Sequence, residues 1–101
     1  MSNKALTLLG FAAKAGKLAY GMDAAVTALK TKKAQLIVVA ADISEKSRKE
    51  ISYHAGNTPV MITEFSIDTL SHAVGKKCGI ISVNDKGFSQ SIMKKIKEEI
   101  C

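Results

Sequence analysis

The chain of 101 residues lacks features that several large classes of protein require. Its two cysteines, Cys78 and Cys101, are too few for the disulfide framework of a small secreted domain. No cysteine–histidine spacing resembles a zinc site. No apolar run approaches the roughly 20 residues that a membrane-spanning helix needs. These absences favour a reducing, cytoplasmic compartment and predict neither a bound metal nor contact with a membrane.

Catalytic and cofactor motifs are also missing from the sequence. The segment GKLAYG (16–21) does not have the spacing of a phosphate-binding P-loop, and the pattern G-x-G-x-x-G does not occur. Lys76 and Lys77 precede Cys78 and could lower the pKa of its thiol. The position of Cys78 at the start of a strand is, however, more typical of a small apolar residue. We therefore expect no catalytic activity and no cofactor.

Aromatic residues are scarce, whereas positive charge is abundant. The chain has no tryptophan, three phenylalanines and two tyrosines, which argues against a flat aromatic platform for base stacking. The net charge is +6, and residues 1–33 alone hold six lysines and one acidic residue, a net +5. This imbalance points to nucleic acid or another anionic surface, and it suits recognition of folded RNA by shape and phosphate. The alternative is a basic protein with no such ligand.

The hydrophobic pattern predicts helices that alternate with strands in one domain, residues 1–101. Ser2 and Ser66 are candidate helix caps, and Gly16 is a candidate helix stop. The segment QLIVVAA (35–41) is apolar on both faces, so helices should cover both sides of its sheet. The ranges predicted as helices are 2–15, 22–33, 44–57, 66–74 and 88–100, and those predicted as strands are 17–20, 35–41, 59–63 and 79–83. The fold class is therefore α/β, with a sheet of about four strands.

A glycine before the second predicted helix and lysines at its far end form the strongest candidate binding feature. Gly21 has no side chain, so a phosphate or base edge can approach the positive end of the helix dipole closely. Lys14 and Lys17 are expected near that end, whereas the lysines at positions 30–33 lie roughly 15 Å away along the helix. The alternative is that Gly21 only permits a positive φ and that the lysines only solvate a helix end.

Three segments carry a resemblance to a known family: LLGFAAKAGKLAYG, ALKTKKAQLIVVAADIS and TLSHAVGKKCGIISVNDKGFSQSI. Over nearly its whole length the chain resembles the L-seven-Ae/L-thirty-e family of ribosomal proteins, and most of all the small bacterial members that stand alone. The resemblance implies a three-layer α/β/α sandwich with a central mixed sheet. It also implies RNA binding, commonly to kink-turns, which are sharply bent RNA motifs.

The resemblance places RNA contacts in three loops, Gly21–Ala24, Asp42–Ser44 and Val74–Cys78. The family signature has asparagine, glutamate and lysine where this chain has Asp23, Ala24 and Thr27. Ala24 has no side-chain acceptor for a guanine, and Asp23 would repel a phosphate. The candidate RNA-contacting residues are Lys14, Lys17, Gly21, Met22, Asp23, Ala24, Thr27, Lys30, Lys32, Lys33, Ile43, Ser44, Gly75, Lys76, Lys77 and Cys78.

The sequence thus predicts a non-catalytic RNA-binding protein of ribosomal-protein type. Its expected partner is ribosomal or other structured RNA, with the ribosome as a further candidate. One alternative is a protein–protein adapter that kept the fold and lost kink-turn recognition. Another is the recognition piece of an RNA-modifying enzyme, although the chain is too short to include a methyl-donor site.

Overall fold

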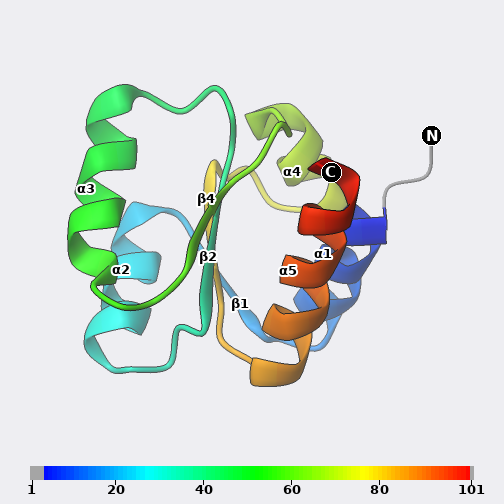
Figure 1. The fold of residues 1–101 in the computed structure, drawn as a ribbon, viewed down its shortest axis with the longest axis horizontal. Coiled ribbons are helices and arrows are strands. Elements are labelled where there is room, and N and C mark those ends of the chain that lie inside the picture. Colours follow the sequence, from blue (N-terminus) through cyan, green and yellow to red (C-terminus); the bar gives the residue numbers. More distant parts are fainter. Residues whose placement is uncertain (1–3, 101) are drawn as a thin grey trace.

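The computed structural model describes residues 4–100, which form five helices and four strands (Figure 1). The predicted alternation is confirmed, and each observed element falls within a few residues of its expected range. In chain order the elements are α1 (Lys4–Lys14), β1 (Leu18–Tyr20), α2 (Met22–Lys30), β2 (Leu36–Val39), α3 (Glu45–Ala55), β3 (Val60–Ile62), α4 (Ile67–Val74), β4 (Ile80–Val83) and α5 (Lys86–Ile100).

The four strands form one mixed sheet in the order β1-β4-β2-β3. Strand β4 is antiparallel to both of its neighbours, and its Ser82 pairs with Ala19 on β1 and with Ile37 on β2. Strands β2 and β3 are parallel, with Ile37 opposite Val60. All residues of the two central strands are buried, as the doubly apolar QLIVVAA segment predicts. The regular strand is shorter than that segment, because the chain turns away after Ala40.

Helices cover both faces of the sheet, which makes a three-layer α/β/α sandwich (Figure 1). Helices α2 and α3 cover one face, where Ile37, Val39 and Ile51 are buried together. Helices α1, α4 and α5 cover the other face, over Val38 and Ile81. Successive β2 side chains thus enter different cores, because side chains alternate along a strand.

The helix ends follow local signals in the sequence. Ser66 caps α4, because its hydroxyl accepts a hydrogen bond from the Thr69 amide at 3.0 Å. Gly16 ends α1 with φ 71°, and its amide donates to the carbonyl of Ala13. Both signals are confirmed. The candidate cap Ser2 lies outside the described residues.

Candidate nucleic-acid interface

Three chain segments that are far apart in sequence meet at one edge of the sheet. Because β4 is antiparallel to β1 and to β2, the end of each neighbour lies beside the start of β4. The Gly21 amide donates to the Ile80 carbonyl at 2.8 Å, and the Ala40 amide donates to the Gly79 carbonyl at 2.9 Å. The sheet order therefore brings together the start of α2, the β2–α3 loop and the α4–β4 loop. We call this surface, residues 21–22, 42–44 and 75–79, the loop edge.

The loop edge contains a hollow of about 300 Å³ whose lining includes four of the predicted site residues. These four are Gly21, Met22, Ile43 and Ser44. The lining also includes Gly79, which was not among the predicted site residues.

Gly79 lets the β2–α3 loop lie close to the start of β4. A Cβ atom at this position would be 2.8 Å from Cγ2 of Ile43 and 3.1 Å from Cγ1 of Ile67, closer than packed side chains approach. A second contact fixes the same loop, because the Asp42 carboxylate accepts a hydrogen bond from the Ile67 amide at 2.8 Å. The only sign of this close packing in the sequence is the glycine that opens the segment GIISV. The residues that pack against it, Ile43 and Ile67, come from two other parts of the chain.

Gly21 adopts a positive φ, which the sequence analysis gave as the alternative reason for a glycine at this position. Its φ of 90° and ψ of 169° lie in a region that is essentially restricted to glycine, so the backbone itself requires this residue. A Cβ atom here would meet nothing within 4 Å, so the residue also leaves open space at the start of α2. Both readings of Gly21 are therefore compatible with the geometry.

The amino terminus of α2 differs from those of α3 and α4. Ser44 and Ser66 cap the latter two helices, whereas no side chain caps α2. First-turn amides have no partner within their own helix, and they lie at the positive end of the helix dipole. These amides of α2 are therefore not capped by a side-chain hydrogen bond, although the Asp23 carboxylate lies in the same turn.

The α4–β4 loop presents two lysines outward and one thiol inward. Lys76 and Lys77 are exposed, and Lys76 Nζ lies 5.2 Å from the centroid of the Tyr20 ring, which ties this loop to the end of β1. Cys78 is 6% exposed. Burial raises the pKa of its thiol, and the charge of Lys76 only partly offsets this effect. The lowered pKa that the two lysines could have caused is therefore not found, and Cys78 behaves as a small core residue.

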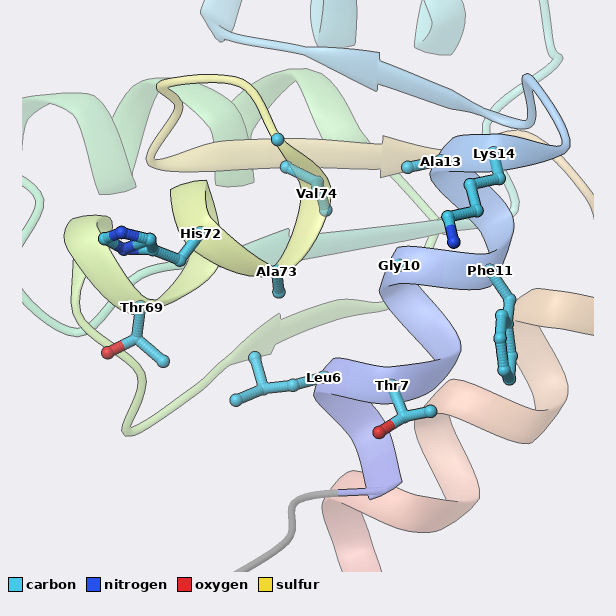
Figure 2. Close-up of a pocket in the computed structure, with 11 residues that line it drawn as sticks. Leu6, Thr7, Gly10, Phe11, Ala13, Lys14, Thr69, His72, Ala73 and Val74 are labelled. Atoms are coloured by element: carbon cyan, nitrogen blue, oxygen red, sulfur yellow. The ribbon is translucent and has the colours of Figure 1, made fainter.

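The predicted lysines near Gly21 lie elsewhere, which corrects that expectation. The Lys17 carbonyl accepts from the Asn84 amide at 2.8 Å, so Lys17 lies at the edge where β4 ends. At about 3.3 Å per residue, the extended chain of β1 separates it from Gly21 by roughly 13 Å. Lys14, at the end of α1, lines a hollow between α1 and α4 (Figure 2). The physical reason is that β1 crosses the sheet between the two ends.

The remaining predicted residues follow α2. A groove between α2 and the edge strand β1 is lined by Ala19, Asp23, Ala24, Thr27, Ala28, Thr31, Lys33 and Asn84. We call it the α2 groove. It collects the three positions at which the chain departs from the family signature. Lys30 ends α2, and Lys32 and Lys33 follow it, with Lys32 at a left-handed φ of 60°.

Among the side chains that the structure describes, no group of three or more histidine, cysteine or acidic residues is placed to hold a metal ion. No helix in the described part of the chain is long and apolar enough to cross a bilayer.

Sequence comparisons point to RNA-binding and ribosomal proteins. The profile described as the ribosomal protein L7Ae/L30e/S12e/Gadd45 family matches residues 3–93. The RNA-binding protein YlxQ of Enterococcus faecium is 33% identical over 98 residues, covering 96% of this chain and 91% of that protein. The large ribosomal subunit protein eL30 of Candida glabrata is 32% identical over 85 residues, covering 80% of this chain and 81% of that protein.

Solved structures share the fold. A Bacillus halodurans protein of unknown function superposes with a TM-score of 0.89 at 29% identity, covering 95% of this chain and 99% of that one. The Giardia lamblia 15.5kD RNA binding protein superposes with a TM-score of 0.71 at 16% identity, covering 92% of this chain and 82% of that one. The latter similarity concerns the fold alone.

Proposed function

Since the chain belongs to the ribosomal protein L7Ae/L30e/S12e/Gadd45 family, we propose that it is a non-catalytic RNA-binding protein of ribosomal-protein type. Residues 1–101 act as one RNA-binding domain in the cytoplasm of a bacterium, on ribosomal or other structured RNA. The observation that carries this proposal is the loop edge, where an uncapped helix start, a bare glycine and two exposed lysines meet.

Each part of the loop edge has a role in holding RNA. The amides at the start of α2 donate to one phosphate, and the side-chain-free face of Gly21 lets the backbone approach a sugar or base edge. Lys76 and Lys77 neutralise further phosphates from the α4–β4 loop. Because phosphate contacts fix orientation and base contacts carry sequence information, this surface recognises shape more than sequence.

We propose that the RNA is bent or kink-turn-like, with less base readout than the family signature provides. Ala24 cannot accept a hydrogen bond from a guanine, and Thr27 adds no positive charge. Asp23 is exposed in the first turn of α2, where its carboxylate favours the helix dipole but opposes a phosphate. The same departures favour the second candidate function, a protein–protein adapter with this fold.

Salt dependence separates the two candidates. We expect affinity for a kink-turn RNA, measured by fluorescence anisotropy, to fall with salt by roughly 0.7–0.9 log units per log unit for each phosphate neutralised. Replacing Lys76 and Lys77 with glutamine should make this slope shallower by the contribution of about one or two phosphates. A matched control replaces Lys94 and Lys97 on α5 and should leave the slope unchanged. If the wild-type protein shows no salt-dependent binding to structured RNA, the adapter becomes the better candidate.

Restoring the signature tests the kink-turn part of the proposal. The triple variant Asp23→Asn, Ala24→Glu and Thr27→Lys should bind a standard kink-turn about 1–3 kcal/mol more tightly, the discrimination that a good polar base contact gives. An unchanged affinity in a folded triple variant would mean that the preferred RNA is not a kink-turn.

A further inference from the structure

The hollow between α1 and α4 (Figure 2) lies on the face of the sheet opposite α2. Figure 1 shows α1 and α4 together on that face. The hollow has a volume of about 860 Å³, within the range of small-molecule sites. The two helices meet along its floor, where a Cβ atom at Gly10 would be 3.0 Å from the Ala73 carbonyl oxygen. Of the residues that line this hollow, only Gly75 belongs to the loop edge. We call it the α1–α4 hollow.

The hollow combines an exposed aromatic ring with a cation. Phe11 lines it and is 55% exposed, a high value for so large an apolar side chain. Lys14 lies one helical turn further on and also lines it. Figure 2 shows the Lys14 side chain running back over Gly10, with the Phe11 ring beside the same stretch of α1. None of its lining residues is acidic.

The hollow is continuous with the loop edge. Gly75 lines it, and Lys76 and Lys77 follow directly in the α4–β4 loop. A smaller hollow lined by Asp68, Ser71, His72, Gly75, Lys76 and Lys77 shares His72 and Gly75 with it. An RNA strand that follows the two lysines thus has a path to the α1–α4 hollow, past one acidic side chain and with lysines at both ends. A nucleotide supplies both of the groups that this lining can hold, a flat aromatic base and a phosphate.

We propose that the α1–α4 hollow binds one unpaired nucleotide of the RNA held at the loop edge. The base stacks on Phe11, and Lys14 contacts the adjoining phosphate. This inference rests on the proposed RNA-binding function. The scarcity of aromatic residues argues against a flat platform on which several bases stack. The proposed site does not need such a platform, because one base stacks on one ring.

The absence of tryptophan makes a direct test possible. In an F11W variant the indole is the only tryptophan, so its emission reports on this hollow alone. The probes are a kink-turn RNA with blunt ends and the same RNA with a single-stranded extension of five adenosines. We expect both RNAs to bind and only the extended one to quench the emission. Equal quenching by the two RNAs, or none, would overturn the proposal.

Affinity gives a second, independent readout. Phe11→Leu keeps an apolar side chain and should weaken binding of the extended RNA about tenfold, the size of one lost base stack, while leaving the blunt RNA unaffected. The matched control is Tyr53→Leu on α3, where the aromatic ring is 84% exposed but lies outside this hollow. Lys14→Gln should lower the salt slope for the extended RNA by about 0.7, one single-strand phosphate.

The outcomes distinguish this inference from the proposed function. If the blunt RNA binds and Phe11→Leu weakens binding of neither RNA, the hollow does not bind RNA and this inference is wrong, while the proposed function stands. If Phe11→Leu and Tyr53→Leu weaken the extended RNA equally, Phe11 has no special role and the proposal fails. If neither RNA binds the wild-type protein, both proposals fail.

Discussion

Gly21 allows a stability prediction that depends on backbone strain alone. We expect Gly21→Ala to destabilise the fold, because φ 90° and ψ 169° are nearly forbidden to a residue with a side chain. The strain destabilises the fold by about 1–3 kcal/mol. Alanine also makes the unfolded chain less flexible, which stabilises the fold by roughly 0.4–1 kcal/mol and so offsets part of the strain. A steric contribution is not expected, since the added Cβ would have no neighbour within 4 Å.

The alternative to strain is a rotation of the backbone, which would also be costly. The Gly21 amide donates to Ile80 at 2.8 Å, and this hydrogen bond would have to lengthen. Either way the net loss should be near 1–2 kcal/mol at the transition midpoint, which lowers Tm by roughly 4–8 °C per kcal/mol for a domain of this size. Urea and thermal unfolding followed by far-UV circular dichroism measure the change directly.

Gly75 provides the matched control for this reasoning. It ends α4 in a left-handed conformation, φ 76° and ψ 18°, that asparagine tolerates. Gly75→Asn should therefore lose less than about 1 kcal/mol, whereas Gly21→Asn should lose as much as Gly21→Ala. Equal losses at the two positions, or a Gly21→Ala variant as stable as the wild type, would refute the reasoning.

The same variant also reports on RNA. The Cβ of Gly21→Ala projects into open space at the loop edge, where the proposed ligand approaches. Measured at a temperature where the variant is fully folded, its affinity for kink-turn RNA should fall by about tenfold, one good polar contact. Unchanged affinity would show that the bare glycine serves the backbone conformation only.

The remaining predictions concern Gly79 and Cys78, two neighbouring residues of the loop edge. Gly79→Ala should cost about 1–3 kcal/mol of unfolding free energy, because its Cβ would overlap Cγ2 of Ile43. Adding Ile43→Ala removes that atom, so the double variant should be more stable than additivity predicts; simple additivity in urea unfolding would contradict the packing argument. In a Cys101→Ser background, alkylation of Cys78 at pH 8 should be slower in the folded protein than in urea, because burial raises the thiol pKa. The raised thiol pKa also makes the free energy of unfolding depend on pH. The contribution of Cys78 is fully present below the thiol pKa of the unfolded chain and is lost as the pH rises through the thiol pKa of the folded protein. Cys78→Ala should remove this fall in the free energy of unfolding. If the variant shows the same pH profile as the wild type, Cys78 is not the cause of the fall.

The sequence by itself determined the elements and the layers of this protein. The QLIVVAA segment, apolar on both faces, required helices on both sides of its strand, and β2 is buried throughout. Ser66 and Gly16 set helix ends through contacts with residues three positions away, Thr69 and Ala13. These features are predictable because the partners are close in sequence, so the pattern contains the whole interaction.

Only the tertiary structure decided which loops and lysines share a surface. The strand order places β4 between β1 and β2, and no periodicity in the sequence encodes that order. It brings Gly21 beside Ile80 and Ala40 beside Gly79, and it sends Lys17 to the opposite edge, against the sequence-based expectation.

The contacts that shape the candidate sites have the same long-range character. Ile43 packs over Gly79, the Asp42 carboxylate accepts from the Ile67 amide, and Phe11 shares a hollow with residues of α4. The partners in these pairs are separated by 25 residues or more in the chain. Their meeting depends on how the strands pair and how the helices pack across the sheet, which is settled by the free energy of the whole fold rather than by any local segment.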